Sequence, residues 1–193
     1  MGSFSSLELV DHHCHSVALS NLTFEDFLSL GTESDWLSED ESETLDNPFG
    51  LALRTLCAPI LNLEKHSSIF DYYNRRNDIG SREVAKIFLG KTGVKALFID
   101  TGFSGEGYAT FEDLREFAAC GVEEVIRIET LAESILSEVN AKGFIKTFQD
   151  KINQVSTNAI GFKTVVAYRF GLDLPASPPA INHVQNAVDE WYK

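Results

Sequence analysis

Two histidines separated by a single residue, His13 and His15, are the side chains of this sequence best suited to bind a metal ion. Side chains alternate along an extended strand, so Asp11, His13 and His15 share one face while His12 and Cys14 point to the other. A neutral imidazole nitrogen is a good ligand for zinc and similar ions. A metal with an open position activates bound water and polarises a carbonyl. The pair therefore predicts a divalent metal cofactor, zinc first, and hydrolytic chemistry.

Such a pair of histidines is also frequent on surface turns, and a complete zinc site needs at least three ligands. Its position in the chain favours the metal site. The pair directly follows a short apolar run, residues 7–11, which we expect to be a strand. In barrels of parallel strands, active sites lie at the carboxyl ends of the strands.

Charged side chains also stand near the ends of the later predicted strands. We expect Arg127 and Glu129 to share one face of a strand and to contact a substrate. Arg169 ends the last predicted strand, and its planar guanidinium suits a substrate carboxylate. Structural ion pairing is the alternative for these residues. A lysine on a fourth strand can be carboxylated and then bridge two metal ions. Lys163 lies early in its predicted strand, so we expect it to have a structural role in the interior instead.

Strands and helices alternate along the sequence, which argues for an α/β fold with parallel pairing. The predicted strands cover residues 7–11, 94–100, 122–129 and 160–169. Capping residues and apolar periodicity predict helices at 24–28, 48–58, 69–76, 82–89, 111–119, from residue 131, at 143–155 and near the end. Four βα units with an extra helical insertion after the first strand form the N-terminal half of a (β/α)8 TIM-type barrel. We expect one partial barrel domain over residues 1–193.

The net charge of -13 and the pI of about 4.7 argue against nucleic acid and anionic membranes as partners. The expected partner is a small-molecule substrate. No apolar stretch approaches the length of a membrane span or forms a signal peptide. The three cysteines are few and widely spaced, which is typical of free thiols in a cytoplasmic protein.

Four segments resemble the amidohydrolase domains related to nodulin/glutamine-synthetase fusion proteins. They are Val10–Ser16, Phe98–Phe103, Arg127–Ala132 and Gly161–Leu172. The resemblance implies a (β/α)8 barrel in which a metal-activated water cleaves an amide or related bond of a small carboxylated substrate. His13 and His15 match the strand-one metal ligands of that family. Its later ligands lie on strands five, six and eight, which we expect beyond Lys193, so this chain alone is expected to be inactive.

Two other functions are compatible with the sequence. A histidinol-phosphatase type of phosphoesterase also begins with a strand that carries the Asp11-x-His13-x-His15-Ser16 pattern. The chain could instead be a half-barrel interaction module without catalysis. A four-stranded parallel half-barrel has open sheet edges, so we also expect self-association through these edges.

Overall fold

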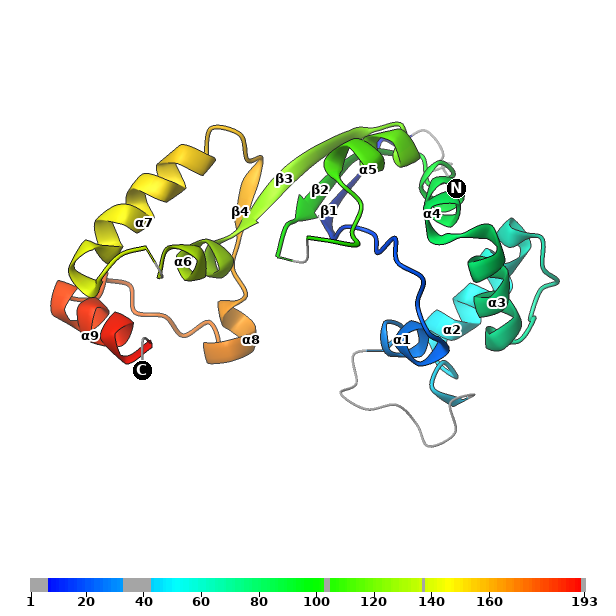
Figure 1. Cartoon of the computed structure of the whole chain (residues 1–193), viewed down its shortest axis with the longest axis horizontal. Coiled ribbons are helices and arrows are strands. Elements are labelled where there is room, and N and C mark those ends of the chain that lie inside the picture. Colours follow the sequence, from blue (N-terminus) through cyan, green and yellow to red (C-terminus); the bar gives the residue numbers. More distant parts are fainter. Residues whose placement is uncertain (1–6, 33–42, 103–104, 137, 192–193) are drawn as a thin grey trace. The chain divides into compact units, whose positions relative to one another are not determined.

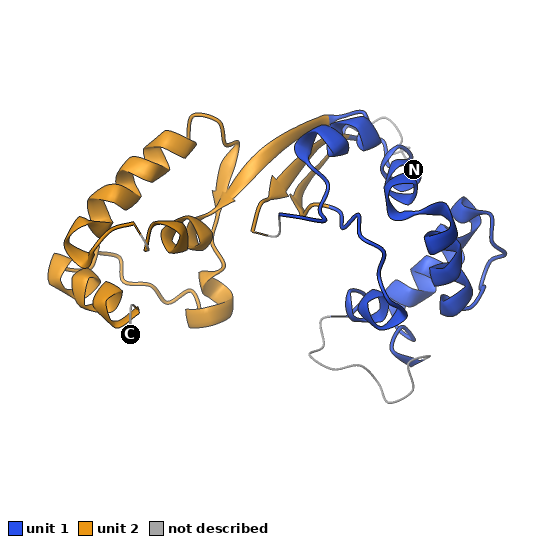
Figure 2. Ribbon diagram, in the orientation of Figure 1, with its two compact units in different colours: residues 1–8, 17–94, 105–120 blue, residues 9–16, 95–104, 121–193 orange. Residues whose placement is uncertain are grey.

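A computed structural model of the chain describes residues 7–32, 43–102, 105–136 and 138–191 (Figure 1). The chain divides into two compact units (Figure 2). Unit 1 comprises residues 1–8, 17–94 and 105–120, and unit 2 comprises residues 9–16, 95–104 and 121–193. A single domain over residues 1–193 stays a prediction.

Unit 1 contains the predicted helical insertion, which is confirmed. Its helices are α1 (Phe24–Ser29), α2 (Pro48–Ala52), the π-helical turn η3 (Leu53–Cys57), the 3-10 turn η4 (Ala58–Leu61), α3 (Ile69–Ile79), α4 (Ser81–Leu89) and α5 (Phe111–Ala118). Capping boxes begin α1 at Thr23 and α5 at Thr110, and these are two of the helices predicted from capping residues. The buried core of this unit consists of Leu28, Leu45, Leu53, Ala58, Leu61, Ile69, Tyr72 and Val84.

The sheet has four strands that follow one another in chain order. They are β1 (Leu9–Cys14), β2 (Val94–Asp100), β3 (Gly121–Arg127) and β4 (Gly161–Lys163). All four run parallel, and the sheet curls like half of a barrel. The register places Asp100 opposite Val125 and Arg127 opposite Lys163. The carboxyl ends of neighbouring strands therefore meet at one edge of the sheet.

Four helices belong to unit 2: α6 (Ile128–Leu136), α7 (Ala141–Val155), α8 (Val166–Phe170) and α9 (Ile181–Trp191). α6, α7 and α9 bury a small core of Ile135, Ala141, Phe144 and Val188. No helix in the described ranges is long and apolar enough to cross a membrane.

Three strand predictions are wrong at their carboxyl ends. The first strand was predicted over residues 7–11, whereas β1 runs from Leu9 to Cys14. β3 ends at Arg127, and Glu129 lies in α6, which begins at Ile128 and therefore before the helix predicted from residue 131. β4 ends at Lys163 instead of Arg169, and a short helix follows. At the end of β4 a long-range contact replaces strand pairing: a carboxylate oxygen of Glu129 accepts a hydrogen bond from the Val165 backbone N–H at 2.9 Å. Because the Val165 N–H bonds to this side chain, it is not paired with a neighbouring strand, and the strand does not continue.

Candidate functional site

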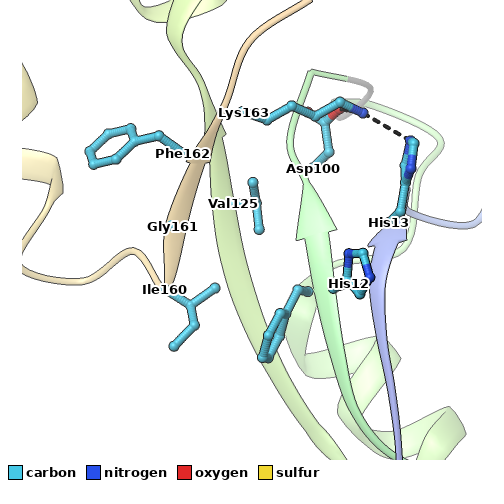
Figure 3. A pocket seen from close by; sticks show the side chains of 9 residues that line it. His12, His13, Asp100, Val125, Ile160, Gly161, Phe162 and Lys163 are labelled. Carbon is cyan, nitrogen blue, oxygen red and sulfur yellow. Dashed lines mark hydrogen bonds and ion pairs between the residues drawn. The ribbon is translucent and has the colours of Figure 1, made fainter.

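Charged side chains gather where the strands of unit 2 end. Figure 3 shows Lys163 from β4 and His13 from β1 reaching toward each other, with Asp100 at the end of β2. They line a pocket of about 320 Å³. Its lining residues are His12, His13, Phe98, Asp100, Val125, Ile160, Gly161, Phe162 and Lys163. Polar groups from three strands thus surround one open space.

Asp100 is the centre of the polar network. Its side chain is buried, and its carboxylate oxygen Oδ2 lies 2.6 Å from Nη2 of Arg127 and 3.0 Å from Nζ of Lys163. The other oxygen, Oδ1, accepts a hydrogen bond from the Gly102 backbone N–H at 2.9 Å. Two cations and one backbone donor therefore hold a single buried carboxylate.

These partners set the charge of Asp100. Burial alone raises the pKa of this carboxyl, but the hydrogen bonds from Arg127, Gly102 and Lys163 together outweigh burial. The pKa falls from its ordinary 3.8 to about 2. Asp100 is consequently ionised at neutral pH and pairs with both neighbouring cations.

The partners of the two histidines fix their tautomers. Nδ1 of His15 lies 3.3 Å from the backbone carbonyl oxygen of Asp100, and because a carbonyl only accepts, Nδ1 carries the proton. Nε2 of His13 lies 3.2 Å from Nζ of Lys163, and an ammonium only donates, so this nitrogen accepts. In the neutral form of each ring, Nε2 is therefore the nitrogen that carries the lone pair, and this is the form that binds a metal.

The types of ligand atom at this edge of the sheet are those that bind zinc and similar ions. It offers two imidazoles, and the Asp100 carboxylate oxygen Oδ2 lies 3.7 Å from Nδ1 of His15. Across the part of the chain that the structure describes, no three His, Cys, Asp or Glu side chains are grouped so that they could hold a metal. The described residues therefore supply an incomplete ligand set, and His13 and His15 remain predicted ligands.

The three predicted substrate contacts are not brought together. Arg127 lies in the network beside Asp100, and its guanidinium packs directly on Gly102. Glu129 faces the turn after β4, where it accepts hydrogen bonds from the Thr164 hydroxyl and from the Val165 N–H. Arg169 is exposed on α8. Substrate binding by these residues stays a prediction.

Lys163 is a site residue whose importance the sequence prediction missed. The predicted strand ran on to Arg169, which left Lys163 in its interior, whereas the real strand ends at Lys163 itself. His12 also lines the pocket, although strand alternation predicted it on the opposite face. A sequence signal for Lys163 was available. β2 and β3 each end at a charged residue, Asp100 and Arg127, so a strand end at the charged Lys163 fits the same pattern.

No protein-family model matches the chain, and no curated protein sequence matches it. Among solved structures, the chain is similar to the crystal structure of a "putative metal-dependent hydrolase" from Lactobacillus casei. The two share 25% sequence identity with a TM-score of 0.68, and the similarity covers 96% of this chain. It covers 49% of the Lactobacillus protein, so this chain spans about half of the length of that protein.

Proposed function

We propose that this chain provides the metal-binding part of a metal-dependent hydrolase. The observation that carries the proposal is the pair His13 and His15 at the end of β1, in which Nε2 is the acceptor nitrogen of each neutral imidazole. The similarity to a solved protein described as a metal-dependent hydrolase, over 96% of this chain, supports it. The family resemblance of the sequence suggests an amidohydrolase that cleaves an amide or related bond of a small carboxylated substrate.

His13 and His15 are the residues that would hold the divalent metal, for which zinc is the first candidate. When bound, the metal supplies an activated water and polarises the bond to be cleaved. The backbone carbonyl of Asp100 orients His15 and fixes its tautomer. The buried Asp100 carboxylate keeps Arg127 and Lys163 at the strand ends. Arg169, exposed on α8, is the proposed contact for the substrate carboxylate.

The proposed architecture is a (β/α)8 barrel of which this chain forms the first half. A catalytic zinc normally has three protein ligands and a water, whereas the chain offers two imidazoles. Further ligands are therefore expected from the second half of the barrel. On this proposal, residues 1–193 alone are inactive in hydrolysis, even if they bind metal.

The test uses the protein product of the native reading frame, loaded with zinc or manganese. It is assayed with N-acyl amino acids as carboxylated amides and, in parallel, with phosphate monoesters. We expect the amides to be hydrolysed, with the rate lost on chelation and reduced more than about tenfold by His13→Ala. His183→Ala, which replaces an exposed histidine of α9, is the matched control and should keep the activity.

Turnover of phosphate monoesters alone would show the phosphoesterase chemistry instead. A product that binds metal but hydrolyses neither class of compound would contradict an enzymatic function and favour an interaction module.

A further inference from the structure

The ammonium of Lys163 occupies the position beside His13 where a metal is expected. Nζ lies 3.2 Å from Nε2 of His13 and 3.0 Å from Oδ2 of Asp100. An imidazole nitrogen has one lone pair in the ring plane, so it can accept from an N–H donor or bind a metal, but not both. The interaction with Lys163 and metal binding at His13 are therefore mutually exclusive.

From this geometry we infer that Lys163 is an internal cation that competes with the divalent metal for His13. The inference rests on the proposed function, because it takes His13 as a metal ligand. In the absence of metal, Lys163 holds His13 and Asp100 together across the sheet. When metal binds, its ammonium leaves the imidazole.

The charges around the site support this role. Arg127 and Lys163 contribute two positive charges beside the one negative charge of Asp100, so these three residues carry a net positive charge without any metal. A divalent ion at His13 would bring two more positive charges close to the ammonium. Like charges in a partly buried site repel strongly, which drives the ammonium away from His13.

The site leaves room for this movement. Lys163 has a long flexible side chain that is 23% exposed, and it lines the pocket of about 320 Å³. A change in side-chain torsions can move Nζ into this space without moving β4. The backbone of the site can therefore stay in place while the cation is exchanged.

Removal of the Lys163 ammonium should change the affinity for metal in a direction that depends on the role of Lys163. If Lys163 helped to hold the metal, removal of its amine would weaken metal binding. If its role were only structural, removal would lower stability without tightening metal binding. Competition alone predicts that a variant without the ammonium binds metal more tightly.

The experiment measures zinc binding to the chain by isothermal titration calorimetry. Lys163→Met keeps the length of the side chain and removes the charge, and we expect the Kd for zinc to fall at least about tenfold. Lys146→Met is the matched control, because Lys146 is exposed on α7 and pairs with Asp150. It should bind zinc like the original chain. An unchanged or weaker affinity of folded Lys163→Met would overturn the inference.

A second comparison separates failure of this inference from failure of the proposed function. In a chain that carries His13→Ala, the additional change Lys163→Met should give no gain in zinc affinity. If His13→Ala alone leaves zinc binding unchanged, the proposed function fails. If His13→Ala weakens binding but Lys163→Met brings no gain, only the competition fails.

A measurement on the original chain covers the case in which Lys163→Met does not fold. Zinc is titrated while NMR follows the side-chain 13Cε signals of the lysines. We expect the signal of Lys163 to move as zinc saturates the site and the signal of Lys146 to stay. A Lys163 signal that remains constant at saturation would contradict displacement of its ammonium.

Discussion

At the scale of single residues, Asp100 organises the site because its partners come from three separate parts of the sequence. Arg127 and Lys163 reach it from β3 and β4, and the carbonyl oxygen of the same residue orients His15. A buried carboxylate without such partners would favour its neutral form. The charge on Asp100 therefore depends on the strand ends being packed together, because β3 and β4 supply its cationic partners.

The lowered pKa of Asp100 predicts how stability depends on pH. Because the folded pKa is about 2 and the ordinary value is 3.8, this group stabilises the fold fully above about pH 4. That contribution, about 2 kcal/mol, is lost as pH falls from about 4 to 2. Urea unfolding at several pH values measures it. Asp100→Asn should unfold more easily at pH 7 and lack this part of the acid loss, and equal slopes in both proteins would contradict the prediction.

Gly102 is predicted to be required for the position of Arg127. A Cβ atom at Gly102 would lie 2.1 Å from Cζ of Arg127, so the guanidinium would have to move away from Asp100. We expect Gly102→Ala to lower the free energy of unfolding by about 1–3 kcal/mol. In Gly143→Ala, the control, the new Cβ meets its nearest atom at 3.7 Å. Equal stability of the two variants would refute this role of Gly102.

At the scale of elements, the sequence predicts a strand correctly when residues next to the strand determine where it begins and ends. β2 was predicted with its observed bounds, because an apolar run follows Gly93 and ends at Asp100. The end of β4 was predicted wrongly, since Val165 and Val166 are β-branched and typical of strands. A carboxylate from α6 decides that end, and the contact between Lys163 and His13 spans 150 residues. Neither contact can be recognised from the sequence near the end of β4, because the partner residues are far away along the chain.

Glu129 is predicted to hold the turn between β4 and α8. Glu129→Ala removes the acceptor of the Thr164 hydroxyl and the Val165 N–H, and should cost about 1–3 kcal/mol. Glu129→Gln keeps one carbonyl oxygen and should cost less. Hydrogen exchange of the Val165 amide measures the effect directly, with Glu133→Ala on the exposed side of α6 as the control. Unchanged protection of Val165 in Glu129→Ala would contradict this role.

The outer strands β1 and β4 are predicted to cause self-association. Each has a neighbouring strand on one side in the sheet order, and exposed apolar side chains include Val10 and Phe162. We expect the sedimentation coefficient of the chain to rise with concentration. Phe162→Lys should reduce this rise, whereas Leu172→Lys, at an exposed leucine outside the strands, should not. A monomer at every concentration would disprove association through these edges.

At the scale of the whole molecule, the candidate site lies within unit 2, although three separate segments build this unit. The histidines come from residues 9–16, Asp100 comes from 95–104, and Arg127 and Lys163 come from 121–193. These segments form the site only when the sheet is folded. Metal binding by such a site is coupled to folding, because the ligands are not preorganised in the unfolded chain.

The most direct test of the metal-binding proposal is zinc binding to the folded chain, measured by calorimetry and elemental analysis. We predict about one zinc ion per chain and a loss of affinity of more than about tenfold in both His13→Ala and His15→Ala. His183→Ala should bind zinc like the original chain. Circular dichroism confirms that each variant is folded. If folded His13→Ala and His15→Ala both bind zinc as the original chain does, the metal site is not at the end of β1.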